Sequence, residues 1–357
     1  MTIVIDCRLL NSSGIGVHLR GCLPYFFKSA NNFLLLGNLT KLNIYESYKN
    51  VNIINCDIKP FSVNELLFFP GNILKQINKA DIYFCPYINI PFGIKIPVYT
   101  TIYDIIFPDM PELLSKTGLA VRMWFFRRAY KKSKKIFTIS EFSKSRIEHH
   151  LGTKKPVIIT YSAIQQIYID YNAASKNIQK KETIIFIGNI KKHKGLDCLL
   201  EAFHLAKKEG LSFQLVIVGS KDSFRSSDKH ISKNIESLTS DSILFTGFIS
   251  DEILMEHLSS ASLLVQPSLY EGFCLPPLEA MVLGTHTLLS DIPVLKEIYG
   301  DYPVSFFKAG DAVDLKEKIV AILKNNKPKN IVLQEHLKNK YTFEKTVSVI
   351  MNNIDIF

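Results

Sequence analysis

Residues 267–281 of the chain read PSLYEGFCLPPLEAM. This stretch places Glu271 in an expected loop and Glu279, eight positions later, inside an expected short helix. A pair of prolines suits the first helical positions, and Gly284 suits the position just past the helix end. The start of a helix offers free backbone amides and the positive end of the helix dipole, which favour phosphate groups. We therefore expect a nucleotide pocket here.

This segment resembles the Glu-x7-Glu signature of the retaining glycosyltransferases of family 4, which have the GT-B architecture. The resemblance implies that Glu271 lies beside the donor sugar and that Glu279 hydrogen-bonds the ribose of the nucleotide. A surface Glu followed by a helix whose early Glu complements the dipole would show the same spacing. Cys274 stands where the family commonly has glycine. The resemblance assigns the sugar and the diphosphate to the backbone at Gly272, Phe273, Cys274 and Leu275.

A strand, a cationic turn and a helix are expected upstream, over residues 183–203. Residues 183–188 form a β-branched apolar run that ends at a glycine, and apolar residues recur at helical spacing from Leu196 to Phe203. The turn between them, 189–195, reads NIKKHKG. Such a turn suits a phosphate group, because the helix start supplies amides and a lysine adds a mobile charge.

Members of the family usually carry Arg-Lys where this chain has His193 and Lys194. The resemblance therefore gives Lys194 the diphosphate-binding role, which His193 shares. Near pH 7 a neutral imidazole would donate a single hydrogen bond, in contrast to a bidentate guanidinium. A basic turn that is merely solvated remains the alternative for both residues.

Two further short apolar strands are expected at 213–219 and 243–249, each ending at a glycine or a polar turn. In the family, the loops after these strands flank the nucleotide base, and Phe248 would form the matching wall. An ordinary core position for Phe248 fits the sequence equally well.

The amino-terminal part begins with an expected strand at 3–6, a loop of small residues at 11–16 and a helix at 17–27. A lone Gly-x-Gly usually marks a tight turn. Here Gly14 and Gly16 also resemble the first loop of the family, in which glycines let the backbone approach the donor phosphates and the acceptor.

An expected strand at 98–104 ends at Tyr103 and Asp104, where many family members have His-Asp. A phenol keeps its proton at neutral pH and cannot act as an imidazole would, so Tyr103 either hydrogen-bonds the sugar or forms part of the wall. Asp104 is the better candidate for orienting a neighbour or contacting the acceptor hydroxyl. Residues 136–144 match another family segment, a strand that leads into a helix capped by Ser140, although a plain capping box explains Ser140 almost as well.

The length of 357 residues favours two domains, and strands alternate with helices throughout. We expect the α/β class, with two doubly wound Rossmann-like domains facing across a cleft as in GT-B. The polar composition around 170–182 marks the boundary. We predict an acceptor-side domain at 1–165, a linker at 166–181, a nucleotide-sugar-binding domain at 182–338, and a closing helix at 339–357 that packs back on the first domain.

Six scattered cysteines lack any Cys-x-x-Cys spacing and indicate a reduced, cytosolic protein. The amino-terminal residues lack the pattern of a secretory signal. The most apolar stretch, 82–107, is interrupted by prolines and charged residues, and it lacks the roughly 20 uninterrupted apolar residues that a membrane span requires. We expect a cytoplasmic protein that does not cross a bilayer.

The net charge of +10 belongs to the amino-terminal part, since residues 1–160 hold 21 Lys and Arg against 10 Asp and Glu. Much of it lies along one expected helix, 122–135, which also carries aromatic residues. Basic groups near an anionic lipid surface contribute about 1 kcal/mol each, which favours peripheral contact with the inner face of the membrane. In the alternative, the aromatic residues are core and the cations are solvated. The basic residues are Arg122, Arg127, Arg128, Lys131, Lys132, Lys134 and Lys135.

The leading hypothesis is a retaining hexosyltransferase that moves a sugar from a nucleotide diphosphate sugar to a hydroxyl of a lipid-linked or oligosaccharide acceptor. The resemblance points to bacterial surface polysaccharides such as O-antigen or capsule, with a mannose-like or deoxyhexose donor. Asp-x-Asp, the usual metal-diphosphate handle in the other major glycosyltransferase architecture, occurs nowhere in the chain, so we expect activity without a divalent metal ion. The nucleotide diphosphate sugar is the donor substrate, and we expect no cofactor. A nucleotide-sugar epimerase, a phosphorylase, and a non-catalytic membrane- or nucleic-acid-binding protein stay open as alternatives, although we expect no nucleic-acid partner.

Overall fold

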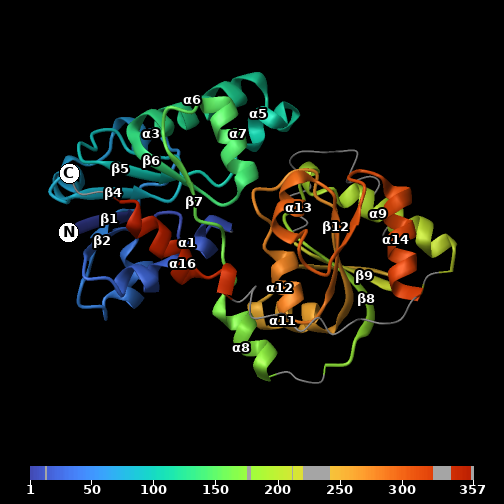
Figure 1. Cartoon of the computed structure of the whole chain (residues 1–357). Coiled ribbons are helices and arrows are strands. Elements are labelled where there is room, and N and C mark those ends of the chain that lie inside the picture. Colours follow the sequence, from blue (N-terminus) through green and yellow to red (C-terminus); the bar gives the residue numbers. More distant parts are fainter. Residues whose placement is uncertain (13, 175–177, 211, 220–241, 325–338, 355–357) are drawn as a thin grey trace. The chain divides into compact units, whose positions relative to one another are not determined.

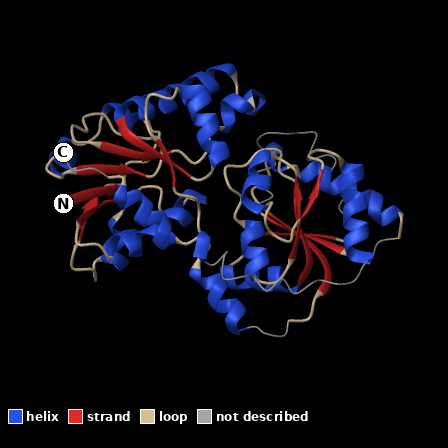
Figure 2. Ribbon diagram, viewed as in Figure 1, coloured by secondary structure: helices blue, strands red, loops and turns tan. Residues whose placement is uncertain are grey.

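The computed structural model describes the chain except residues 13, 175–177, 211, 220–241, 325–338 and 355–357. The described residues form two compact units, Met1–Ala163 with Tyr341–Phe357, and Ile164–Lys340. Each unit contains a parallel sheet with helices on both faces (Figures 1 and 2). The predicted class of two parallel α/β domains is confirmed.

The first unit has a sheet in the order β3-β2-β1-β4-β5-β6-β7, with all of these neighbours parallel. The strand order reverses between β1 and β4, and ligands of open α/β sheets bind beyond the carboxyl ends of strands at such a point. The strands are β1 (Thr2–Asp6), β2 (Asn32–Gly37), β3 (Val51–Asn55), β4 (Ile82–Cys85), β5 (Val98–Thr101), β6 (Ser133–Thr138) and β7 (Val157–Ile159).

The helices of the first unit cover this sheet, and α7 begins as predicted, because the Ser140 side chain accepts a hydrogen bond from the Ser143 amide at 3.0 Å. Short 3-10 turns lie at Asn43–Tyr45 and Pro111–Leu113. The helices are α1 (Gly14–Phe27), α2 (Leu39–Leu42), α3 (Val63–Leu67), α4 (Gly71–Ile77), α5 (Ile106–Asp109), α6 (Lys116–Lys132), α7 (Glu141–Leu151) and α16 (Phe343–Asn352).

The predicted basic helix at 122–135 is wrong at its carboxyl end. Helix α6 stops at Lys132, and Lys134 and Lys135 belong to strand β6. This strand pairs with β5 and β7, so sheet formation overrides the helical pattern of the cations.

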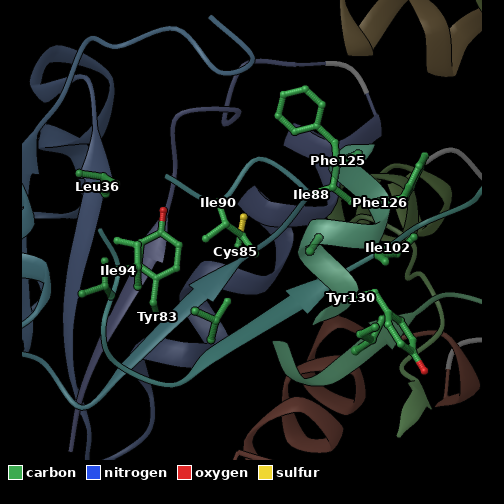
Figure 3. Close-up of a cluster of buried hydrophobic side chains, with 14 of the residues drawn as sticks. Leu36, Tyr83, Cys85, Ile88, Ile90, Ile94, Ile102, Phe125, Phe126 and Tyr130 are labelled. Atoms are coloured by element: carbon green, nitrogen blue, oxygen red, sulfur yellow. The ribbon is translucent and has the colours of Figure 1, made fainter. Parts of the chain in front are cut away.

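One core of the first unit lies between its sheet and α6, where Tyr83, Ile102 and Phe126 are buried (Figure 3). A second core lies on the other face and includes α16. The Phe343 ring packs so closely on Gly21 of α1 that a Cβ there would lie 2.2 Å from the ring. The closing helix therefore completes the first unit.

The second unit has a parallel sheet in the order β10-β9-β8-β11-β12-β13. Its strands are β8 (Lys181–Ile187), β9 (Gln214–Val218), β10 (Ile243–Gly247), β11 (Ala261–Gln266), β12 (His286–Ser290) and β13 (Ser305–Phe307). Its helices are α8 (Gln166–Ala174), α9 (Leu196–Lys208), α11 (Asp251–Ser260), α12 (Pro276–Val282), α13 (Pro293–Tyr299) and α14 (Ala312–Lys324), with a 3-10 turn at Lys192–Lys194. Helix α8 occupies much of the segment that its polar composition predicts to be a linker.

Candidate functional site

An ion pair joins the two segments that the sequence singles out in the second unit. Lys194 ends the turn after β8, and its Nζ lies 2.7 Å from Oε1 and 2.8 Å from Oε2 of Glu271. The Ser268 hydroxyl donates a further hydrogen bond to Glu271 Oε1 at 2.7 Å. The side chain of Lys194 is 20% exposed and that of Glu271 is 8% exposed. The cationic turn and the acidic loop therefore share one largely buried site.

The electrostatics of this pair fix the charge of Glu271. Burial by itself would raise the pKa of this carboxyl group, but the charge of Lys194 and the hydrogen bonds from Lys194 and Ser268 outweigh burial and lower the pKa. Glu271 is consequently ionised near neutral pH. An ammonium group has three donors, so Lys194 can bind an incoming oxyanion while it keeps contact with the carboxylate.

His193, beside Lys194, is a neutral group in this site. Burial, followed by the charge of Lys194, lowers the pKa of His193 to about 4. Its Nδ1 atom is buried and has no hydrogen-bond partner among the described residues. The imidazole can therefore take one hydrogen bond from or to a ligand, but at pH 7 it adds no positive charge.

Gly195 explains how the turn approaches the acidic loop. Its φ of +66° lies in the left-handed region, and an added Cβ would lie 2.0 Å from the carbonyl oxygen of Pro267. The backbone is tied again nearby, where the His193 carbonyl accepts a hydrogen bond from the Leu269 amide at 2.7 Å. Only glycine fits this contact without displacement of the backbone.

The loop from Glu271 to α12 is held in a fixed shape. Cys274 has a φ of +73°, a conformation that favours glycine, and its carbonyl accepts a hydrogen bond from the Tyr299 hydroxyl. The backbone at this position is thus one that a glycine would adopt readily. The predicted helix boundaries are confirmed, since α12 begins at Pro276 and Gly284 follows its end with a φ of +74°. Gly272, Phe273 and Cys274 are buried, and Leu275 is half-buried.

Glu279 has a partner that the sequence does not predict. Burial, followed by the charge of Asp251, raises the pKa of this carboxyl group to about 8, and a hydrogen bond with Tyr168 opposes this shift only in part. Tyr168 lies on α8 and is itself buried. It stands in the predicted linker, where a tyrosine between two isoleucines is the one signal that could have indicated packing.

The position of Phe248 after β10 bears on its two interpretations, a wall beside the nucleotide base and a core residue. Phe248 follows this strand and its side chain is 82% exposed, so its interpretation as a core residue is wrong. The exposed ring stays available to a ligand.

The remaining predicted site residues lie in the first unit. Tyr103 is buried, and its hydroxyl has no hydrogen-bond partner among the described residues. It packs edge-on against His18 of α1 at 5.3 Å between ring centroids. Asp104 is half-buried after β5, and its Oδ1 accepts a hydrogen bond from the Ile106 amide at 3.2 Å.

The two glycines of the first loop differ in what they contact. Gly16 lies against the backbone of its own loop, because a Cβ there would be 2.3 Å from the Leu10 carbonyl oxygen. Gly14 is exposed and has nothing within 4 Å of its Cβ position. The close packing of α1 on the loop thus explains why a residue without a side chain is needed at Gly16.

A second group that the sequence does not predict is a charged network beyond the carboxyl end of β1. Arg8 contacts Asp6 at 2.6 Å and Glu65 at 2.7 Å, and all three side chains are buried. The Tyr83 hydroxyl donates to Asp6 at 2.7 Å, and the Asn89 amide donates to Glu65 at 3.0 Å. These contacts fix the first loop of the unit at the switch point of the sheet.

The sequence is similar to one family model and to known glycosyltransferases. Residues 169–339 match the family model of the glycosyl transferases group 1. O-antigen chain mannosyltransferase B of Escherichia coli is 29% identical over 233 residues, which cover 62% of this chain and 60% of that protein. The N,N'-diacetylbacillosaminyl-diphospho-undecaprenol alpha-1,3-N-acetylgalactosaminyltransferase of Campylobacter jejuni is 25% identical over 291 residues, which cover 76% of this chain and 74% of that protein.

Among solved structures, Anabaena Alr3699/HepE in complex with UDP and glucose superposes with a TM-score of 0.73 at 15% identity, covering 99% of this chain and 98% of that chain. None of the described helices has the length and apolar composition needed to cross a membrane. The chain therefore has the GT-B fold, and its second unit matches the sequence pattern of the glycosyl transferases group 1.

Proposed function

We propose that the protein is a retaining glycosyltransferase that moves a sugar from a nucleotide diphosphate sugar to a hydroxyl of a lipid-linked or oligosaccharide acceptor. The observation that carries this proposal is the ion pair of Lys194 and Glu271, in the unit that matches the family model and also holds the buried Glu279. In the reaction, the bond from the anomeric carbon to the diphosphate breaks, a bond to the acceptor oxygen forms, and the proton of the acceptor hydroxyl passes to the departing diphosphate.

Each residue contributes by position and charge. Lys194 stabilises the negative charge that develops on the departing diphosphate, and His193 adds a neutral hydrogen bond. Glu271 orients the sugar, and Glu279 accepts a hydrogen bond from a ribose hydroxyl. Asp104 serves the acceptor side. The remaining contacts with the donor come from Gly14, Gly16, Phe248 and the loop residues Gly272, Phe273, Cys274 and Leu275, with Tyr103 beside Asp104.

The setting we propose is the cytoplasmic face of the cell membrane, in the synthesis of a surface glycan such as O-antigen or capsule. The names of the relatives favour a mannose-like donor and an acceptor on a lipid diphosphate. The first unit supplies peripheral contact with anionic lipid through its basic helix α6. Since the chain lacks Asp-x-Asp, we propose that the reaction proceeds without a divalent ion.

A thermal-shift screen against a panel of nucleotide sugars tests donor binding directly, because ligand occupancy raises the melting temperature. We expect one nucleotide sugar to stabilise the wild type selectively. Lys194→Gln should abolish the shift, whereas His193→Gln, which keeps a neutral hydrogen-bonding group, should retain most of it. Lack of any stabilisation by the panel would argue against the proposal.

The products separate the remaining possibilities. A transferase consumes the donor only when an acceptor is present, whereas an epimerase converts the nucleotide sugar alone. The anomeric configuration of the product, read by NMR, tests retention. Loss of activity on chelation, with recovery on addition of manganese, would refute the metal-independent reaction.

A further inference from the structure

A cavity of about 560 Å³ lies on the first unit between α6 and the loop that precedes β5. We propose that it binds the phosphate headgroup of an anionic membrane lipid, and that this lipid is distinct from the acceptor being glycosylated. The inference rests on the proposed function for its membrane setting, and it replaces diffuse adsorption of a basic surface by one defined site. The residues that carry it are Phe92, Trp124, Arg127, Arg128, Lys131 and Lys132.

Two aromatic rings form the apolar part of this headgroup pocket. Phe92 is 44% exposed and Trp124 is 45% exposed, and their ring centroids lie 6.4 Å apart. Val121, one turn earlier on α6, is 57% exposed and continues the apolar surface. The indole ring of Trp is amphipathic and is favoured at the level of lipid headgroups, and the apolar ring of Phe92 adds to the apolar surface beside it.

Arg128 connects the two sides of the pocket, which are helix α6 and the loop that precedes β5. Its guanidinium donates hydrogen bonds to the carbonyl oxygens of Ile90 and Pro91, and it stacks over the Phe92 ring at 4.1 Å. Behind the walls, Ile90 and Phe126 are among the buried side chains of the core in Figure 3. The shape of the pocket is therefore built into the fold.

The other cations are available to a ligand. Arg127, Lys131 and Lys132 are exposed and form no salt bridge within the described part of the chain. No acidic residue lines the pocket among the described residues, and the sequence contains none between Glu112 and Glu141. Three uncompensated cations beside two exposed rings complement a phosphate group attached to an apolar chain.

The place of the pocket in the sheet separates its ligand from the reaction. The loop at Phe92 precedes the amino end of β5, and Lys132 precedes the amino end of β6. Asp104, the acceptor-side candidate, follows the carboxyl end of β5. A headgroup in the pocket therefore lies near the amino ends of the strands, whereas Asp104 lies at their carboxyl ends. The bound lipid serves to hold the protein on the membrane.

The test uses the full-length protein and vesicles of phosphatidylcholine with or without phosphatidylglycerol at fixed ionic strength. Trp124 is the only tryptophan of the chain, so a blue shift of its emission reports burial in the membrane at this site. The double variant Arg127→Gln/Lys131→Gln removes two charges from the pocket. The matched control Lys116→Gln/Lys154→Gln removes two exposed charges from the same unit outside the pocket.

We expect the emission shift only with anionic vesicles, a loss of roughly thirtyfold in partitioning for the pocket variant, and at most about threefold for the control. Equal losses in both variants would show diffuse adsorption and overturn the proposal. An emission shift with inorganic phosphate alone, or with single-stranded RNA in place of vesicles, would also overturn it. Equal urea midpoints establish that the variants fold.

The nucleotide-sugar thermal shift keeps the two proposals separate. We expect the pocket variant to retain this shift in full, because neither Arg127 nor Lys131 is among the residues proposed to contact the donor. Specific vesicle binding without any donor-induced shift would refute the transferase function while it supports the lipid pocket.

Discussion

Replacement of Lys194 by methionine leaves the Glu271 carboxylate buried without its counter-charge. Removal of one partner from a buried ion pair costs about 3–5 kcal/mol of unfolding free energy. Two features place this pair at the lower end, about 3 kcal/mol. The Lys194 side chain is 20% exposed, which lets water approach the vacated position, and the Ser268 hydroxyl still donates to the carboxylate.

A double-mutant cycle isolates the interaction. Glu271→Gln should cost less, about 1–2 kcal/mol, because Lys194 can turn its charge toward solvent. The double variant Lys194→Met/Glu271→Gln should resemble Glu271→Gln alone, so the coupling energy should equal the cost of Lys194→Met, about 3 kcal/mol. Additive losses in the double variant would refute the geometry described for the pair.

The pH dependence gives an independent check. In the wild type, the pKa of Glu271 is lower in the folded protein than in the unfolded chain. This difference stabilises the folded protein when the pH is above the pKa of the unfolded chain, and the stabilisation is lost as the pH falls through the pKa of the folded protein. In Lys194→Met, burial is no longer offset and raises the pKa of Glu271, so its carboxyl group is protonated as the pH falls. The deficit of the variant should therefore shrink from pH 7 toward pH 4, and a constant deficit would contradict this reasoning.

The assay must report on the second unit. The single tryptophan, Trp124, lies in the first unit, so its fluorescence does not follow the unfolding of interest. Urea unfolding is best monitored by far-UV circular dichroism, together with hydrogen exchange of the amides in β11 and α12.

Substitutions at three further positions test helix α12, the loop before it and the turn after β8. Burial raises the pKa of Glu279 to about 8 in the folded protein. The wild type should therefore lose stability as the pH rises from the pKa of Glu279 in the unfolded chain through 8. Over that range, urea titrations should show that Glu279→Gln gains stability relative to the wild type. Cys274→Gly should be more stable than Cys274→Ala by about 1 kcal/mol, the reverse of the usual order, because φ is +73°; an Ala variant of equal or greater stability would count against the strained backbone. Gly195→Ala should lose roughly 2 kcal/mol or more and weaken donor binding in the thermal-shift screen, since its Cβ would meet the Pro267 carbonyl; an unchanged midpoint would contradict the close contact.

The sequence predicts most of the fold, because the signals there are local. Alternating strand and helix patterns give the parallel class, and the proline pair and Gly284 mark α12 correctly. The predicted end of the basic helix at residue 135 is wrong, because the pairing of β6 with its neighbours depends on residues distant in the chain.

The site divides in the same way. The spacing of Glu271 and Glu279 and the basic turn at Lys194 are local patterns, and they are enough to indicate a shared site. Tyr168 could not be assigned to Glu279, since a contact between α8 and α12 leaves no mark in either segment. The network around Arg8 is also invisible in the sequence, because its partners come from three separate segments of the chain.

The packing of α16 against α1 has a consequence for biosynthesis. The first unit obtains part of its core from Phe343, Val347 and Ile350, which leave the ribosome after the whole of the second unit has been made. Folding that proceeds as the chain emerges would therefore complete the later unit first, while the earlier one waits with an apolar surface uncovered. Chaperone dependence during translation should accordingly centre on the amino-terminal half.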